Sequence, residues 1–216
     1  MGNLSKPPHV KSTAKNPRKN DPQGLRTRIL DAAAELFQIR GYFATSMQDL
    51  MQAAEVTGGA LHHHFPSKKS LGLAVIAERV APTVRETWIE PLHAASSLRK
   101  AVSGVFAEII ASIETRGRVA GCPLNNLALE LTLSDPQFRE SINEVFAEWQ
   151  GALAERLGAT RRGARLERSK RMHAAAFIIS SYSGAMTLAK TSQSAGPLLA
   201  VANDLTQWIQ ARQFVP

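Results

Sequence analysis

Three consecutive histidines, His62, His63 and His64, are the first side chains in this sequence that suggest a chemistry, because histidine is a common zinc ligand. A zinc site needs three or four ligands arranged around one ion. Consecutive residues of a helix point about 100° apart, so three neighbouring histidines on a helix cannot surround a single ion. We therefore predict no metal site at this position.

Two other short patterns have the spacing of catalytic motifs. Glu90 and His93 fit the Glu-x-x-His of di-iron bundles, but such sites need a second copy and further carboxylates on facing helices. Ser97 and Lys100 fit Ser-x-x-Lys, whose companion motifs Ser-Asp-Asn and Lys-Thr-Gly are absent. We predict no catalytic residue and no cofactor. The alternative hypothesis is a small helical enzyme with a basic N-terminus, with or without a dependence on a metal.

Cys122 is the single cysteine, so no disulfide can form within the chain, as is typical of a reducing compartment. It lies between Gly121 and Pro123 at a predicted helix start, where backbone N–H groups stabilise a thiolate. Arg116 and Arg118 would add positive charge. A reactive thiol is one interpretation, and a small buried apolar side chain is the other and more common one.

The histidines belong to a pattern of short helices. After Ser46 the apolar residues recur at helical spacing, with Ser46 as N-cap and Asp49 placed to complete a capping box. Thr57 begins a second helix, Pro66 ends it, and Ser67 caps a third. Two helices joined by a turn of three or four residues are typical of a DNA-binding helix-turn-helix. Similar helix pairs also occur in other all-α proteins.

The second short helix begins with residues that expose its backbone. Gly58 and Gly59 each lower helix stability by about 1 kcal/mol relative to alanine, which favours a role in close approach to another backbone. Because Gly58, Gly59 and Ala60 present little side chain, we expect base reading to come from Gln48 and His63. Glutamine can pair with the edge of an adenine through two hydrogen bonds.

The charge of the chain agrees with a nucleic-acid partner. The formal net charge is +8, and the residues up to Val80 carry 11 basic against 6 acidic side chains, a net +5. Basic charge concentrated around a helix-turn-helix is typical of a protein that binds a polyanion. No apolar run reaches the length of a bilayer span, so we expect no membrane partner and a cytoplasmic location.

Several stretches in register resemble the DNA-binding segment of TetR-type repressors: Gly41-Tyr42, Thr45-Ser46, Ala54-Glu55-Val56, Gly59-Ala60-Leu61 and His64-Phe65-Pro66-Ser67-Lys68. The resemblance covers residues 26–80, and the remainder is similar only in length, helical pattern and a few short stretches. It implies a homodimeric repressor that binds a palindromic operator in double-stranded DNA and is released by a small-molecule or electrophile effector.

The resemblance also implies which residues contact DNA. Thr45 and Lys68 match positions that contact the DNA backbone, whereas His62 replaces the usual phosphate-contacting tyrosine, which leaves that contact in doubt. The predicted DNA-binding residues are Thr45, Ser46, Gln48, Thr57, Gly58, Gly59, Ala60, His62, His63 and Lys68.

For the effector, the resemblance implies a pocket inside the C-terminal domain. Cys122 matches a branch in which a Gly-Cys lies beside the ligand pocket, and Lys190 matches a lysine close to that cysteine. The predicted ligand-binding residues are Trp88, Phe106, Cys122, Phe146, Trp149, Phe177, Tyr182 and Lys190. For each aromatic side chain, plain core packing is the alternative. The last two helices, the first of them rich in small residues, are implied to form the dimer interface.

The predicted fold class is all-α: an N-terminal three-helix bundle with the helix-turn-helix, followed by a larger helical ligand-binding and dimerisation domain. We predict a disordered basic arm over residues 1–21, a DNA-binding domain over 22–80 and the second domain over 81–216. The arm is either a solvated tail or an additional DNA contact. The helices of the second domain are expected at about 83–95, 98–115, 123–133, 136–158, 165–190 and 196–213.

Local patterns give expectations for three further places in the chain. Pro82 should end or kink the helix that Ser67 begins. Tyr42 and Phe43 should close the small N-terminal core. The basic segment 161–171 is either a solvated loop and helix start or a second nucleic-acid patch.

Overall fold

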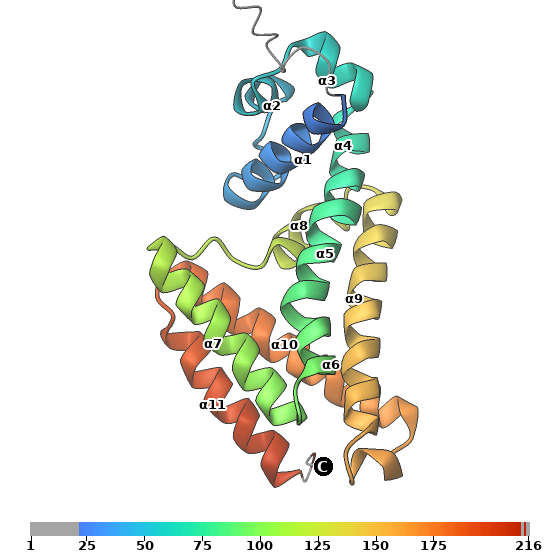
Figure 1. Ribbon diagram of the computed structural model, residues 1–216, viewed down its shortest axis with the longest axis vertical. Helices are drawn as coiled ribbons and strands as arrows, with labels where there is room; N and C mark the ends of the chain where they lie inside the picture. Colours follow the sequence, from blue (N-terminus) through green and yellow to red (C-terminus); the bar gives the residue numbers. More distant parts are fainter. Residues whose placement is uncertain (1–21, 213, 215–216) are drawn as a thin grey trace, which may run out of the picture.

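The computed structural model describes residues 22–212 and residue 214, and they form helices without a strand. The predicted basic arm, residues 1–21, lies outside the described residues. The all-α prediction is confirmed, with a short-helix N-terminal part and a larger helical C-terminal part (Figure 1). The α-helices are α1 (Pro22–Ile39), α2 (Met47–Ala54), α3 (Gly58–His64), α4 (Lys68–Val75), α5 (Ala81–Val84), α6 (Glu90–Ala94), α7 (Leu98–Arg116), α8 (Pro123–Leu131), α9 (Pro136–Gly158), α10 (Arg168–Ser192) and α11 (Gly196–Ala211).

Helices α1, α2 and α3 lie together at one end of the molecule (Figure 1). Their apolar faces meet in a small core, in which Ile29, Phe37, Leu50 and Leu61 are completely or almost completely buried. Tyr42 joins this core as expected. The expectation for Phe43 was wrong: the residue is 60% exposed, and its ring lies at the surface against that of Tyr42, with the ring centres 5.4 Å apart.

The helix that begins at Lys68 does not end at Pro82. It continues to Ala94 through α4, α5 and α6, joined by the π-helical turns η2 (Ile76–Val80) and η3 (Arg85–Ile89). Proline lacks an N–H and pushes away the carbonyl four residues earlier. The wider turn η2 accommodates this, with the Ala81 N–H bonded to the Ile76 carbonyl. Pro82 has no N–H to donate to the Glu78 carbonyl, and the Arg79 guanidinium, 2.8 Å away, donates to it instead.

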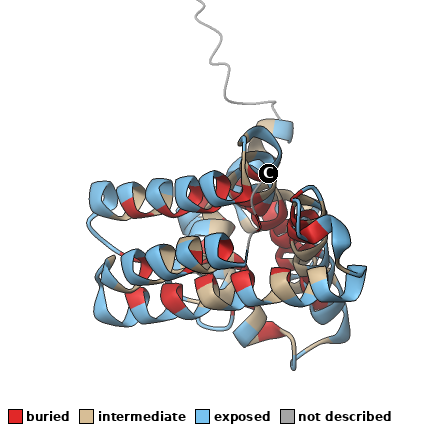
Figure 2. Ribbon diagram, turned by 90° about the horizontal axis from the view of Figure 1, so that it is seen from below, coloured by how far each residue is buried: buried red, intermediate tan, exposed pale blue. Residues whose placement is uncertain are grey.

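The remaining helices pack around the lower part of this long helical column (Figure 1). Helix α9 runs beside it, while α7, α10 and α11 form a second layer in which α11 contacts both α7 and α10. Buried residues line the inward faces of these helices and exposed residues cover the outside (Figure 2). The short helix α8 connects α9 with α1, because it packs on both of them.

Candidate functional site

Helix α2 begins with the capping box that the sequence predicts. The Ser46 hydroxyl accepts a hydrogen bond from the Asp49 N–H at 3.0 Å, and the Asp49 carboxylate accepts one from the Ser46 N–H at 2.7 Å. The Ser46 hydroxyl also donates to the Asp49 carboxylate. This bond and the one from the Ser46 N–H lower the pKa of Asp49, because both favour its charged form. The N-terminus of α2 is therefore held in a defined conformation at the surface.

A tight turn connects α2 with α3. Glu55 ends α2 in the left-handed conformation, with φ 54°. Thr57 then caps α3, and its hydroxyl accepts a hydrogen bond from the Ala60 N–H at 3.3 Å. Two short helices separated by residues 55–57 have the arrangement of a helix-turn-helix, in which the second helix can enter a major groove.

The predicted DNA-binding residues lie close together along α2, α3 and their flanking turns. Six of them are exposed: Ser46, Gln48, Thr57, Gly59, His62 and His63. Gly58, Ala60 and Lys68 are half-buried. Thr45 differs from this expectation: it is completely buried, and its hydroxyl donates to the Gly41 carbonyl at 2.8 Å. In this conformation Thr45 stabilises the turn and does not present its hydroxyl to a partner.

Lys68 is the first residue of α4, and its ammonium lies 4.3 Å from the centre of the Tyr42 ring. Burial lowers the pKa of Lys68, and the nearby charges of Glu130 and Asp49 act in the opposite direction. The lysine that matches a phosphate-contacting position is thus held by the protein before any DNA is bound.

The three histidines do not form a ligand set for a metal. His62 and His63 are exposed, and the His63 and His64 rings contact each other with their centres 5.2 Å apart. Within residues 22–212, no group of three His, Cys, Asp or Glu side chains could hold a metal ion.

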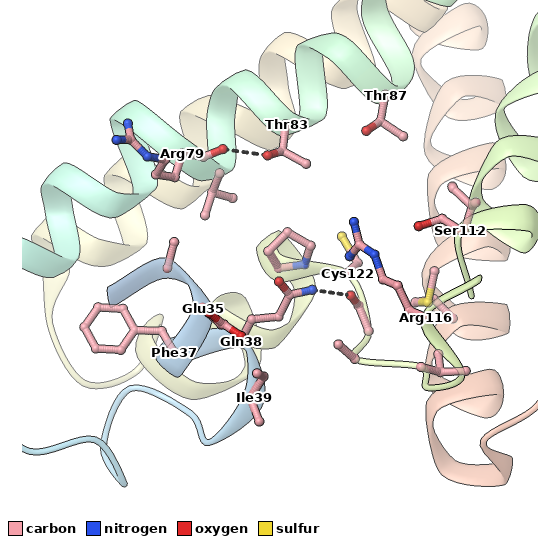
Figure 3. A pocket seen from close by; sticks show the side chains of 18 of the residues that line it. Glu35, Phe37, Gln38, Ile39, Arg79, Thr83, Thr87, Ser112, Arg116 and Cys122 are labelled. Carbon is pink, nitrogen blue, oxygen red and sulfur yellow. Dashed lines mark hydrogen bonds between the residues drawn. The ribbon is translucent and has the colours of Figure 1, made fainter. Parts of the chain in front are cut away.

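A cavity of about 750 Å³ lies between the N-terminal helices and the C-terminal layer (Figure 3). Helix α1 contributes Glu35 and Gln38 to its wall, and the long helical column contributes Thr83 and Thr87. The remaining walls come from α7, from residues 118–123 and from α10. The Gln38 amide crosses the junction and donates to the Gly121 carbonyl at 3.0 Å (Figure 3).

Cys122 lies in the wall of this cavity. Its side chain is buried, and burial raises the pKa of the thiol. Backbone N–H groups at the start of α8 and the Tyr182 hydroxyl oppose this shift without overcoming it. Of the two interpretations of Cys122, the structure favours the small buried side chain over the stabilised thiolate, because desolvation outweighs the effect of the helix N-terminus.

The structure separates the predicted ligand-binding residues into five places. Cys122 and Tyr182 line the cavity. Trp88, Phe106 and Trp149 form a buried aromatic cluster with Tyr182, and the Trp88 and Tyr182 ring centres are 4.9 Å apart. Tyr182 thus connects this cluster with the cavity.

The other three residues lie outside the cavity wall. Phe146 stacks on Trp149 and lines an open groove of about 470 Å³ between α8, α9 and α10. Phe177 is 46% exposed and packs on Trp208 of α11. The Lys190 ammonium donates to the Asn126 side-chain carbonyl at 3.1 Å.

Most of the cavity wall was not predicted from the sequence. The predicted pocket consists mainly of aromatic residues of the C-terminal part, whereas polar residues of α1, α5 and α7 surround much of the cavity. One signal was available in the sequence: Glu108, Ser112 and Arg116 recur every four residues and form a polar stripe along α7, and all three line the cavity.

The basic segment 161–171 connects α9 with α10 at the end of the molecule opposite α3 (Figure 1). Arg161, Arg162, Arg165 and Arg168 are exposed there. Both interpretations of this segment stay predictions.

Comparisons with known proteins agree with this geometry. The family described as bacterial regulatory proteins, tetR family, matches residues 29–75, and the C-terminal domain described as transcriptional regulator LmrA/YxaF-like matches residues 99–204. The HTH-type transcriptional regulator LmrA of Bacillus subtilis is 26% identical over 179 residues, which are 82% of this chain and 93% of LmrA. No helix within the described residues is long and apolar enough to cross a membrane.

Two solved structures are similar over nearly the whole chain. A TetR transcriptional regulator from Chloroflexus aurantiacus is 29% identical with a TM-score of 0.74, and the match covers 88% of this chain and 96% of that one. The TetR family regulator CifR, solved with a 26-base-pair operator DNA, has the same fold with a TM-score of 0.73 at 24% identity, over 88% of this chain and 98% of CifR. The chain described here belongs to the TetR family of helix-turn-helix, DNA-binding transcriptional regulators, which are not enzymes.

Proposed function

We propose that this protein is a cytoplasmic repressor that binds a palindromic operator as a homodimer and releases it when a small molecule occupies the cavity. Residues 22–80 form the DNA-binding domain in this proposal, and residues 81–216 form the effector-binding and dimerisation domain. The observation that carries the proposal is the position of the cavity, whose wall combines α1 with α7 and α10.

The DNA contact is proposed at the exposed surface of α2 and α3. Gln48 and His63 are exposed there and can reach base edges, while Gly58 and Gly59 allow the start of α3 to approach the DNA closely. A Cβ at Gly59 would meet nothing within 4 Å, so this glycine is not required by packing within the chain. In the DNA complex, the missing side chain at Gly59 would leave room for the DNA to approach the start of α3.

A homodimer is supported by the apolar surface of the C-terminal helices. Of the seven large apolar side chains that are exposed in the described residues, five lie on or directly after α8, α10 and α11: Leu129, Leu133, Phe177, Leu188 and Leu199. Exposed apolar surface of this kind marks an interaction site. A second copy packed on α10 and α11 would cover it and would place two α3 helices on the same face of a duplex.

Effector release follows from the shared cavity wall. A ligand shifts a conformational equilibrium only when it binds one conformation better than the other. Because Gln38 on α1 and Ser112 on α7 face the same space, the volume of the cavity depends on how α1 is oriented relative to α7. A ligand that fits one orientation would therefore change the orientation of α2 and α3.

The proposal can be tested with labelled duplex DNA from upstream of the protein's own gene. A titration followed by fluorescence anisotropy should show saturable binding that competes with unlabelled operator and not with a shuffled duplex. Sedimentation analysis should give two chains per operator. Binding of equal strength to both duplexes, or a monomer on the operator, would contradict it.

A cavity-filling variant tests the effector part without knowledge of the ligand. Ser112→Trp places a large side chain in the cavity and should weaken operator binding. Ser103→Trp is the matched control, because Ser103 lies on the same helix α7 and is exposed. If both variants bind the operator as tightly as the parent protein, the cavity does not control DNA binding.

A further inference from the structure

Glu130, near the end of α8, connects the C-terminal part of the molecule with the turn that precedes α2. Its two carboxylate oxygens accept hydrogen bonds from consecutive backbone groups, the Tyr42 N–H at 2.8 Å and the Phe43 N–H at 2.7 Å. Glu130 is separated from both of these residues by more than 80 positions along the chain. Hydrogen bonds to a carboxylate are stronger than neutral ones, and two on adjacent N–H groups fix an orientation.

The turn is built to accept this carboxylate. Gly41 adopts a φ of +93°, a conformation that side chains with a Cβ rarely adopt. A Cβ at Gly41 would lie 3.1 Å from both Glu130 carboxylate oxygens. Glycine at this position therefore allows both the turn and the close approach of Glu130.

We propose that Glu130 is a positioning residue for DNA binding, which holds the start of α2 in its orientation from the C-terminal side of the molecule. The path is short and continuous. Glu130 binds the Tyr42 and Phe43 N–H groups, the Thr45 hydroxyl donates to the Gly41 carbonyl at 2.8 Å, and Ser46 then caps α2.

The same helix lies beside the cavity. Helix α8 begins at Pro123 in the cavity wall, and the Asn126 side-chain amide donates to the Gln38 carbonyl at 3.4 Å and to the Ala120 carbonyl at 3.1 Å. A ligand that displaces the start of α8 would move Glu130 with it. This regulatory consequence rests on the proposed function, whereas the positioning role concerns DNA binding without any effector.

The charge of Glu130 distinguishes positioning from a simple surface effect. Glu130 acts electrostatically on Lys68, which matches a phosphate-contacting position. A carboxylate in this place repels a DNA phosphate, so removing its charge should strengthen DNA binding if Glu130 is only a surface charge. If Glu130 positions the turn, the same removal should weaken binding. The two roles therefore predict changes of opposite sign.

Two variants of Glu130 separate the effect of its charge from the effect of its side-chain length. Glu130→Gln keeps the length but replaces one acceptor with an NH₂ group, and Glu130→Asp keeps the charge but is too short to bind both N–H groups. We expect each to weaken operator binding about tenfold, by anisotropy at constant salt. Glu140→Gln is the matched control, because Glu140 is exposed on α9, and it should bind like the parent.

Amide hydrogen exchange gives a second readout, and its first part needs only the parent protein. The Phe43 amide should be protected in the parent protein although the side chain is 60% exposed, and both Glu130 variants should lose this protection.

The inference is overturned if the parent binds its operator and Glu130→Gln binds equally or more tightly, or if the Phe43 amide of the parent exchanges freely. Failure of the parent to bind any operator would instead contradict the proposed repressor function.

Discussion

Gly72 provides a sharp test of how the DNA-binding helices are joined to the rest of the molecule. This residue lies on α4, and a Cβ added there would be 2.9 Å from Cε2 of Tyr42 and 3.0 Å from Cε1 of Phe138. Carbon atoms in contact are normally about 3.5–4.0 Å apart, so the added methyl group would overlap two ring atoms from two other elements. Both rings are rigid and buried, and neither can move without displacing its own neighbours.

The magnitude follows from two opposing effects. Overpacking of this kind costs about 1–3 kcal/mol in the free energy of unfolding. Replacing glycine by alanine inside a helix contributes about 1 kcal/mol in the stabilising direction. We therefore expect Gly72→Ala to destabilise the protein by about 0–2 kcal/mol. The control is Gly104→Ala on α7, where a Cβ meets nothing within 4 Å, and it should stabilise the fold by up to about 1 kcal/mol.

The assay is thermal unfolding of the parent and both variants under one set of conditions. For a chain of this size, 1 kcal/mol shifts the midpoint by about 2–4 °C, so Gly72→Ala should melt several degrees below Gly104→Ala. Gly72→Ala should also weaken operator binding, because relief of the overlap moves α4 relative to Tyr42 and Phe138. Equal midpoints for the two variants would refute the packing described at this junction.

Three further predictions concern side chains that carry or can carry a charge. Lys68→Ala should weaken binding to operator and random duplexes by the same factor and reduce the slope of log affinity against log salt by about 0.9, whereas an unchanged slope would mean that Lys68 contacts no phosphate. Cys122 should react slowly with iodoacetamide in the native protein and rapidly after unfolding, because burial raises the pKa of its thiol; equal rates would contradict that burial. Asp49, Glu78 and Glu148 have pKa values below their ordinary range because hydrogen bonds favour their charged forms, so the unfolded chain binds protons more readily. The stability that these carboxylates contribute should be complete above about pH 5 and be lost as the pH falls through their lowered pKa values in the folded state, and a melting temperature that does not fall on acidification below about pH 5 would argue against it.

Local signals explain why the helix-turn-helix could be predicted from the sequence. The caps at Ser46, Thr57 and Ser67 depend on residues no more than three positions away, and all three are present in the structure. The expectation that failed nearby, for Phe43, depended on how one side chain is directed within a turn, which apolar character alone does not determine.

The candidate site beyond the helix-turn-helix depends on contacts between distant parts of the chain. The Gln38–Gly121 hydrogen bond joins residues 83 positions apart, and no local pattern in the sequence indicates it. The burial of Cys122 likewise comes from elements that pack over it, so the helix start and its basic neighbours could not decide between the two interpretations of this residue. Pro82 was predicted to end or kink the helix, and it does not end it, because the wider turn before it and the Arg79 side chain together accommodate the missing N–H.

The selection of operator sequences from a pool of genomic DNA fragments by the purified protein tests the central claim most directly. A dimer that presents two α3 helices to one face of a duplex should enrich an inverted repeat, with its half-sites separated by about one helical turn. The bound complex should contain two chains for each copy of this repeat. Enrichment without a repeated half-site, or no enrichment over random fragments, would contradict the account.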